Sequence, residues 1–194
     1  LAVDSALPDR QNIIFTLHTV LAWPNLVNYL NFVTYLLDNK LLTPYMDVSM
    51  WLLTNINVYS LQVLPRFKKD KYKNMMLSFI DDIESRIEHN VITAGETTVH
   101  RVDNGMLDTN RNLHKIIGFV ERALIFMEEQ QLPLISDDVH CMIFKQDKIR
   151  GEDFFKAFPE HEDMRELLIS LDTEFENKWK AQNENNLYLG RRWV

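Results

Sequence analysis

The sequence contains few of the residues that build turns, with only 5 glycines and 6 prolines among 194 residues. β-Sandwiches and β-barrels need many turns, so this scarcity argues against them and favours long helices joined by few connections. Hydrophobic residues make up 46% of the chain and charged residues 25%, which is ordinary for a globular protein with a buried core. Disorder of the whole chain is therefore not expected.

Other absences restrict the class of protein. Cys141 is the single cysteine, which excludes an intramolecular disulfide and suits a reducing compartment such as the cytoplasm or nucleus. No apolar run approaches the roughly 18–20 residues that a membrane span needs. The start, "LAVDSALPDR", has neither Met nor a signal-peptide pattern, so we expect an intracellular protein and infer an excised domain or a fragment of a larger multi-subunit component.

The spacing of apolar residues predicts helices along nearly the whole chain. The expected helices cover residues 8–22, 25–39, 44–61, 70–89, 108–131, 137–149, 152–158 and 160–183. We find no internal repeat and no change in composition that would mark a boundary. The sequence thus predicts an all-α fold: a single domain over residues 1–194, built as a compact bundle of about seven or eight helices. A short irregular helical-repeat solenoid is the alternative.

Two of these helices carry apolar residues on more than one side, which one neighbour cannot cover. The helix at 25–39 is apolar nearly all round, and that at 108–131 has Phe119, Ile125 and Phe126 beside its main stripe. Some of this surface is expected to be covered by a partner chain. Trp23 and Trp51 lie within helical patterns and are expected in the core.

The segment 90–106 interrupts the helical pattern. It contains two of the five glycines, a hint of alternating polarity, and the turn signal Asn104-Gly105. We expect an extended loop with a short hairpin. Long irregular loops often carry function, so this one is a candidate lid over a ligand site near His100, Arg101 or His114.

Six histidines are candidates for metal binding or catalysis, but none has a second histidine at helical ligand spacing. They are His18, His89, His100, His114, His140 and His161. Two clusters stand out: Glu84, Glu88 and His89, and Asp137, Asp138, His140 and Cys141. For the second, the simpler interpretation is acids in the first turn of a helix beside a buried thiol. For His18, a hydrogen-bonded core histidine is the favoured interpretation. Nucleotide-binding, serine-hydrolase and zinc-protease motifs are absent, so we assign no catalytic residue, metal ligand or cofactor.

The stretch "RFKKDKYK" concentrates positive charge in an acidic chain of net charge −7. Its basic residues are Arg66, Lys68, Lys69, Lys71 and Lys73. Lysines at a helix start oppose the helix dipole, although Asp70 as N-cap would reduce this cost. The first interpretation is a solvated basic turn balancing nearby acids. An acidic protein surface or a phosphate is the next, and RNA the last, since the overall charge disfavours nucleic-acid binding.

The C-terminal stretch "NNLYLGRRWV", residues 185–194, is a candidate docking tail after the last helix. Tyr188, Arg191, Arg192 and Trp193 are of the residue types that dominate interface energies. Folding back onto the domain's own core is an equal alternative.

These observations predict a non-enzymatic scaffold or adaptor domain that binds another protein or a second copy of itself. The predicted partner-binding residues are the five basic residues of 66–73 and the four named in the tail. Two alternatives stay open. The first is a helical enzyme or a small-ligand or metal-binding domain with the 90–106 loop as its lid. The second is an RNA-binding protein that uses the 66–73 segment.

Overall fold

The fold is mostly helical, as predicted, with a short two-stranded parallel sheet in addition. It is seen in a computed structural model that describes residues 15–39, 41–42, 46–54, 57–88, 100–102, 105–107 and 109–190. Among these residues, no helix combines the length and hydrophobicity needed to cross a bilayer.

The elements follow one another along the chain as strands, α-helices and short 3₁₀ or π turns. In order they are β1 (Phe15–Leu21), η2 (Trp23–Asn25), α1 (Leu26–Asp38), β2 (Met46–Leu52), η3 (Asn57–Tyr59), η4 (Leu61–Val63), α2 (Arg66–Glu88), β3 (His100–Val102), β4 (Gly105–Leu107), α3 (Thr109–Glu129), α4 (Ser136–Val139), η5 (His140–Phe144), α5 (Lys145–Arg150), α6 (Phe154–Ala157), η6 (Pro159–Met164) and α7 (Arg165–Gly190).

Two predicted helices, at 8–22 and 44–61, are wrong: the chain forms β1 and β2 there, followed after β2 by the short turns η3 and η4. The strands pair in parallel, with Val20 opposite Trp51. Parallel neighbours need a crossover connection, which α1 supplies. Both strands alternate, so that Leu21, Val48 and Met50 are buried while alternate residues face outward.

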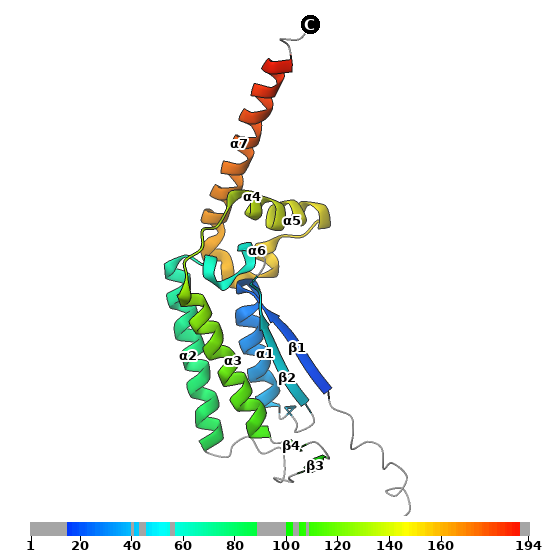
Figure 1. The fold of residues 1–194 in the computed structure, drawn as a ribbon, viewed down its shortest axis with the longest axis vertical. Coiled ribbons are helices and arrows are strands. Elements are labelled where there is room, and N and C mark those ends of the chain that lie inside the picture. Colours follow the sequence, from blue (N-terminus) through cyan, green and yellow to red (C-terminus); the bar gives the residue numbers. More distant parts are fainter. Residues whose placement is uncertain are drawn as a thin grey trace, which may run out of the picture.

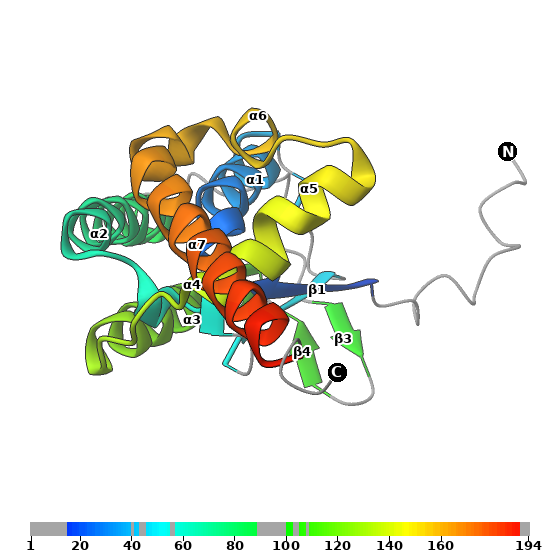
Figure 2. The same ribbon diagram turned by 90° about the horizontal axis from the view of Figure 1, so that it is seen from above.

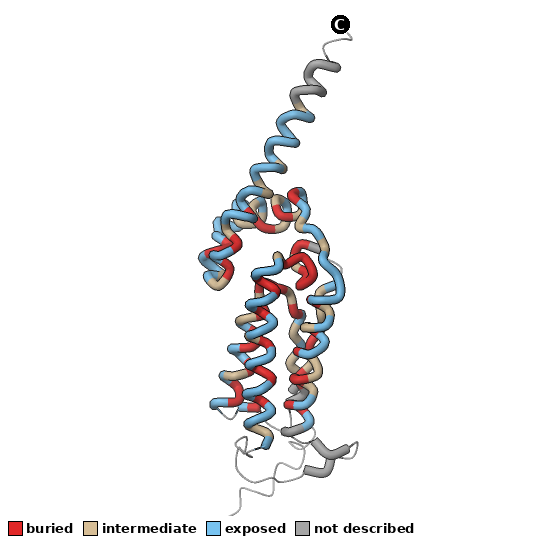
Figure 3. The backbone as a smooth tube through the Cα atoms, turned by 90° about the vertical axis from the view of Figure 1, so that its left-hand side faces the viewer, coloured by how far each residue is buried: buried red, intermediate tan, exposed pale blue. Residues whose placement is uncertain are grey.

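The helices and the sheet form an elongated body (Figure 1). The helices α2 and α3 lie side by side, the sheet lies beyond α3, and β1 is its outermost strand (Figures 1 and 2). The helices α4, α5 and α6 gather at one end, and α7 projects from that end away from the body. Buried residues follow the inner faces of the body, whereas residues 176–182 of α7 are exposed (Figure 3).

The core joins all the long helices to the sheet. Its most completely buried large side chains are Leu21, Trp23, Leu26, Leu61, Leu64, Tyr72, Met76, Ile83, Leu113, Ile116 and Met127. The amphipathic stripe predicted for 70–89 is confirmed, and so is the helix predicted at 108–131. A short antiparallel hairpin, β3 with β4, confirms that part of the 90–106 prediction, although its turn residues 103–104 lie outside the described residues.

Helix ends differ from prediction at two places. The helix α2 begins at Arg66, and the carbonyl oxygen of Pro65 accepts hydrogen bonds from the backbone N–H groups of Lys68 and Lys69, so Asp70 lies inside the helix and is not its N-cap. At the other end of the chain α7 continues to Gly190, so residues 185–190 are helical.

Candidate functional site

The basic segment forms the first turns of α2, and the structure divides its residues into buried and exposed ones. The side chains of Lys68 and Lys69 are buried, with only 0% and 2% of their surface accessible. Arg66, Lys71 and Lys73 are exposed. A buried ammonium group is costly unless it is paired, so the contacts of Lys68 and Lys69 decide what this segment can do.

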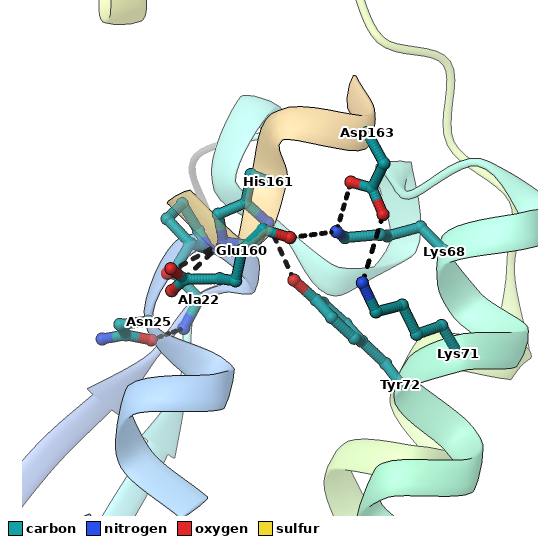
Figure 4. Close-up of polar contacts among 9 residues, drawn as sticks. Ala22, Asn25, Lys68, Lys71, Tyr72, Glu160, His161 and Asp163 are labelled. Carbon is teal, nitrogen blue, oxygen red and sulfur yellow. Dashed lines mark hydrogen bonds and ion pairs between the residues drawn. The ribbon is translucent and has the colours of Figure 1, made fainter. Parts of the chain in front are cut away.

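Lys68 is held by the η6 turn, far away in sequence (Figure 4). Its Nζ donates to the backbone carbonyl of Glu160 at 2.7 Å and to Oδ1 of Asp163 at 2.5 Å. Burial lowers the pKa of Lys68, and the hydrogen bond that Lys68 donates to Asp163 opposes this shift without cancelling it. Partial burial would raise the pKa of Asp163, but the bonds and charges of Lys68 and Lys71 outweigh that effect and lower it. Asp163 is therefore a carboxylate at neutral pH, facing the amino group of Lys68.

Most of the other charges in the segment are also used inside the molecule. Lys69 Nζ donates to the carbonyl of Gln130 at 3.3 Å, and Lys71 Nζ reaches Oδ2 of Asp163 at 3.3 Å. Arg66 bonds Glu128 at 2.8 Å. These contacts join the start of α2 to the end of α3 and to η6. They leave less free positive charge at this surface than the number of basic residues suggests. Binding of an external anion here stays a prediction.

A second buried chain of hydrogen bonds lies beside Lys68. Nε2 of His161 lies 3.1 Å from the carbonyl of Pro24, which can only accept, so this nitrogen carries the proton. Nδ1 then accepts from the hydroxyl of Tyr72 at 2.9 Å. Burial lowers the pKa of His161 and raises the pKa of Tyr72. Both groups are consequently neutral at physiological pH, and each fixes the orientation of the other.

This polar cluster, which we define as Lys68, Tyr72, Glu160, His161 and Asp163, lies at the carboxyl end of β1 (Figure 4). Open parallel sheets bind ligands at that edge, which makes the cluster the strongest candidate for chemistry on positional grounds. Its donors, however, are engaged with internal acceptors. Among the described residues, the buried side-chain atoms without a hydrogen-bond partner are Glu160 Oε1 and the Tyr29 hydroxyl.

An enzyme needs acids or bases that can exchange protons with a substrate, and the cluster does not offer a free set. The neutral, doubly bonded imidazole of His161 and the fully buried ammonium of Lys68 act instead as connectors between α2, η6 and the turn after β1. The geometry supports a structural role. The side chains of Lys71 and Asp163 are partly exposed there, 49% and 35% accessible.

The predicted cluster around Cys141 lies at the junction of α4 and the π-helical turn η5. The ring of His140 contacts α7, where its Nδ1 lies 2.7 Å from Oδ1 of Asp172 and its plane stacks on Phe175 at a centroid distance of 4.1 Å. Cys141 and Asp137 are exposed. In the described part of the chain, no three His, Cys, Asp or Glu side chains are placed to hold a metal ion.

The remaining histidines are scattered. His18 is exposed on the outer face of the sheet, where its Nδ1 contacts the Ser49 hydroxyl, so its prediction as a core residue is wrong. His114 is exposed on α3, as are Glu84 and Glu88 on α2. His89 lies outside the described residues, as does most of the lid predicted at 90–106, namely 90–99 and 103–104. His100 and Arg101 belong to β3.

The tryptophans separate into buried and exposed ones. Trp23 is fully buried, as predicted, and its Nε1 donates to the carbonyl of Val58 at 2.6 Å. Trp51 is 68% exposed, which overturns the prediction that it belongs to the core, because strand alternation turns it outward next to Val20. Trp179, on the projecting part of α7, is 58% exposed.

Other apolar side chains predicted to need a partner are open as well. On α1, Phe32 is 41% and Tyr35 56% exposed, and on α3 Ile125 is 68% exposed. Of the predicted tail, Tyr188 lies within α7, and Arg191, Arg192 and Trp193 lie outside the described residues.

Comparisons of this chain with protein-family models, with curated proteins and with solved structures return no match.

Proposed function

We propose that the protein is a non-enzymatic interaction module, a scaffold or adaptor, and that the projecting half of α7 is an arm that docks onto another protein. The arm comprises residues 176–190, beyond Phe175, whose ring stacks on His140 of the body; within the arm Lys178 still contacts the Ser136 hydroxyl at 3.3 Å. Its central support is Trp179, a large aromatic side chain held 58% exposed on a helix that has left the body. Exposed tryptophan on a regular element is the kind of residue that anchors an interface.

The physics of an isolated helix supports the same proposal. Stretches of about 12–15 residues are only marginally helical in water without tertiary packing. Where the arm leaves the body, the pairs Glu174–Lys178 and Glu176–Lys180 add a few tenths of a kcal/mol each at most. A partner groove that buries Trp179 would supply the missing packing. Tyr188 lies within this arm, and Arg191, Arg192 and Trp193 follow it in the sequence; all four are proposed to contribute at its far end.

The test is affinity capture from a cell lysate with the full chain in three forms. They are the wild type, Trp179→Ala and the matched control Gln182→Ala. Both altered positions are exposed on the arm, so folding is expected to be unchanged in each. The proposal expects one protein, retained in near-stoichiometric amount by the wild type and by Gln182→Ala, to be lost with Trp179→Ala. Retention that is equal for all three forms would contradict it, and so would a stoichiometric bound metal or cofactor.

A further inference from the structure

The arm and the residues after it carry charge of the opposite sign to the rest of the chain. Residues 1–175 contain 17 basic and 26 acidic residues, a net charge of −9. Residues 176–194 contain four basic and two acidic residues, a net charge of +2. An acidic protein thus presents a basic extension, and this contrast bears on the chemistry of the surface that the arm can meet.

The length of the arm separates its charge from that of the body. From residue 176 to Gly190 the arm has 15 residues, which span about 22 Å at a rise of about 1.5 Å per residue (Figure 1). The Debye length at physiological ionic strength is about 8 Å. The negative charge of the body is therefore largely screened at the far end, where Arg191 and Arg192 follow in the sequence. An acidic surface that the body repels can approach the arm there.

The two lysines beside Trp179 are also available to a partner. Lys178 pairs with Glu174 and Lys180 with Glu176, but the side chains of both lysines are more than half exposed. Exposed ion pairs of this kind contribute little to stability. They can therefore be exchanged for contacts with carboxylates of another molecule.

Building on the docking role of the arm, we propose that its partner is a protein with an acidic surface around an apolar pocket. The pocket accepts Trp179, and the carboxylates around it pair with Lys178 and Lys180. Arg191 and Arg192 add positive charge beyond the helix and strengthen the attraction to the same surface.

Two other anionic partners fit the arm less well. The phosphates of a nucleic acid form a continuous line of negative charge, which would also meet Glu176 and Glu184 between the basic residues. A helix that lies on an anionic membrane needs a continuous apolar face. One turn beyond Trp179 the helix carries the polar residues Gln182 and Asn183, so the described part of the arm has no such face. The carboxylates of a folded protein occupy discrete positions and can match the lysines while avoiding the glutamates.

The test follows the amide signals of the isotope-labelled full chain by NMR while poly-L-glutamate is added. Signals of the arm should shift, and the apparent Kd should rise with salt. Arg191→Glu combined with Arg192→Glu reverses the charge of the arm and should weaken binding about tenfold or more. The matched control, Lys145→Glu combined with Lys148→Glu, makes the same change in net charge at exposed positions of α5. It should weaken binding by less than about twofold, because screening separates α5 from the far end of the arm.

Parallel titrations with poly(U) RNA and with vesicles of phosphatidylserine and phosphatidylcholine identify the class of partner. Stronger binding of the arm to either than to poly-L-glutamate overturns the proposal. It is also overturned if the arm signals do not shift, or if the two double variants weaken binding equally. Arm signals that shift with protein concentration alone would assign the arm to the acidic body of a second copy, which contradicts the proposal as well.

Trp179→Ala distinguishes this inference from the proposed function. Poly-L-glutamate has no pocket, so the substitution should change its binding by less than about twofold, whereas capture of the partner protein should be lost. If the wild type captures no protein and its arm still binds poly-L-glutamate as described, the proposed function fails and the preference of the arm for carboxylates stands.

Discussion

The ammonium group of Lys68 lies 2.5 Å from a carboxylate oxygen of Asp163, ninety-five positions further along the chain, and it is completely buried. Together with the bond from Lys68 to the carbonyl of Glu160, this contact fastens the start of α2 to the turn that precedes α7. Positive charge that looks like a binding patch in the sequence is thereby used to hold the fold together.

Replacing Lys68 tests this role. Lys68→Ala removes the donor to the Glu160 carbonyl and leaves the carboxylate of Asp163 without its buried partner. Because Asp163 is partly exposed, we expect a loss near the lower end for a broken buried pair, about 2–3 kcal/mol in the free energy of unfolding. Urea denaturation measures it. Lys73→Ala, at an exposed position of the same helix, should change stability by less than about 0.5 kcal/mol. Equal effects of the two substitutions would contradict the structural role.

Acid should weaken the fold through His161. Its pKa is lowered in the folded state, so as pH falls below about 6.5 the unfolded chain gains this proton first. The free energy of unfolding should therefore decrease from about pH 6.5 downward. His161→Gln should be less stable at pH 7.5 but lose less between pH 7.5 and 5.5 than the wild type does. Urea midpoints at three pH values show the difference; parallel curves for the two proteins would refute the assignment.

The tryptophans provide a second contrast. Trp23→Phe leaves a cavity and removes the hydrogen-bond donor to the carbonyl of Val58. We expect the free energy of unfolding to fall by about 2–4 kcal/mol. Trp51→Thr, on the open face of the sheet, should change stability by less than about 0.5 kcal/mol. Thermal unfolding of the two variants distinguishes the positions. A large loss for Trp51→Thr in a monomeric sample would mean that its face is covered by this chain.

Two glycines should respond to alanine in opposite directions. Gly151 ends α5 with φ of 67°, a conformation that alanine adopts only with strain, so Gly151→Ala should cost about 1 kcal/mol. Gly118 lies inside α3, where an added Cβ would meet only the Arg122 side chain at 3.8 Å. Gly118→Ala should therefore stabilise the protein by about 0.5–1 kcal/mol. Denaturant midpoints give both signs, and a destabilised Gly118→Ala would indicate tighter packing around α3.

The long helices were predictable because their signal is local. On α2, Tyr72, Met76 and Ile83 recur at helical spacing, and the same residues are buried. The sheet was not predictable in this way. The same segment fits two patterns. A helix is compatible with apolar spacing at residues 14, 17, 18 and 21, and a strand with the alternation of Leu17, Thr19 and Leu21. Pairing with β2, thirty-one positions away, selects the strand.

The candidate site was harder to predict for the same reason. Nothing near Lys68 in the sequence indicates that its acceptors are Glu160 and Asp163. The local sequence therefore suggested an exposed charge. The arm carried a weak signal: beyond Trp179 the positions that continue its apolar stripe are Gln182 and Asn186, which marks the point where the helix has no core to face. His161 gave no local signal at all.

Hydrogen exchange along α7, measured on the isolated chain, tests the account most directly. If the outer half of this helix is an unoccupied docking arm, amides from about Glu176 onward should exchange orders of magnitude faster than those near Leu168, which is buried in the core. The captured partner should then slow the exchange of the outer half specifically. If all amides of α7 are equally protected from exchange in the isolated chain, the claim that its outer half is an unoccupied docking arm is contradicted.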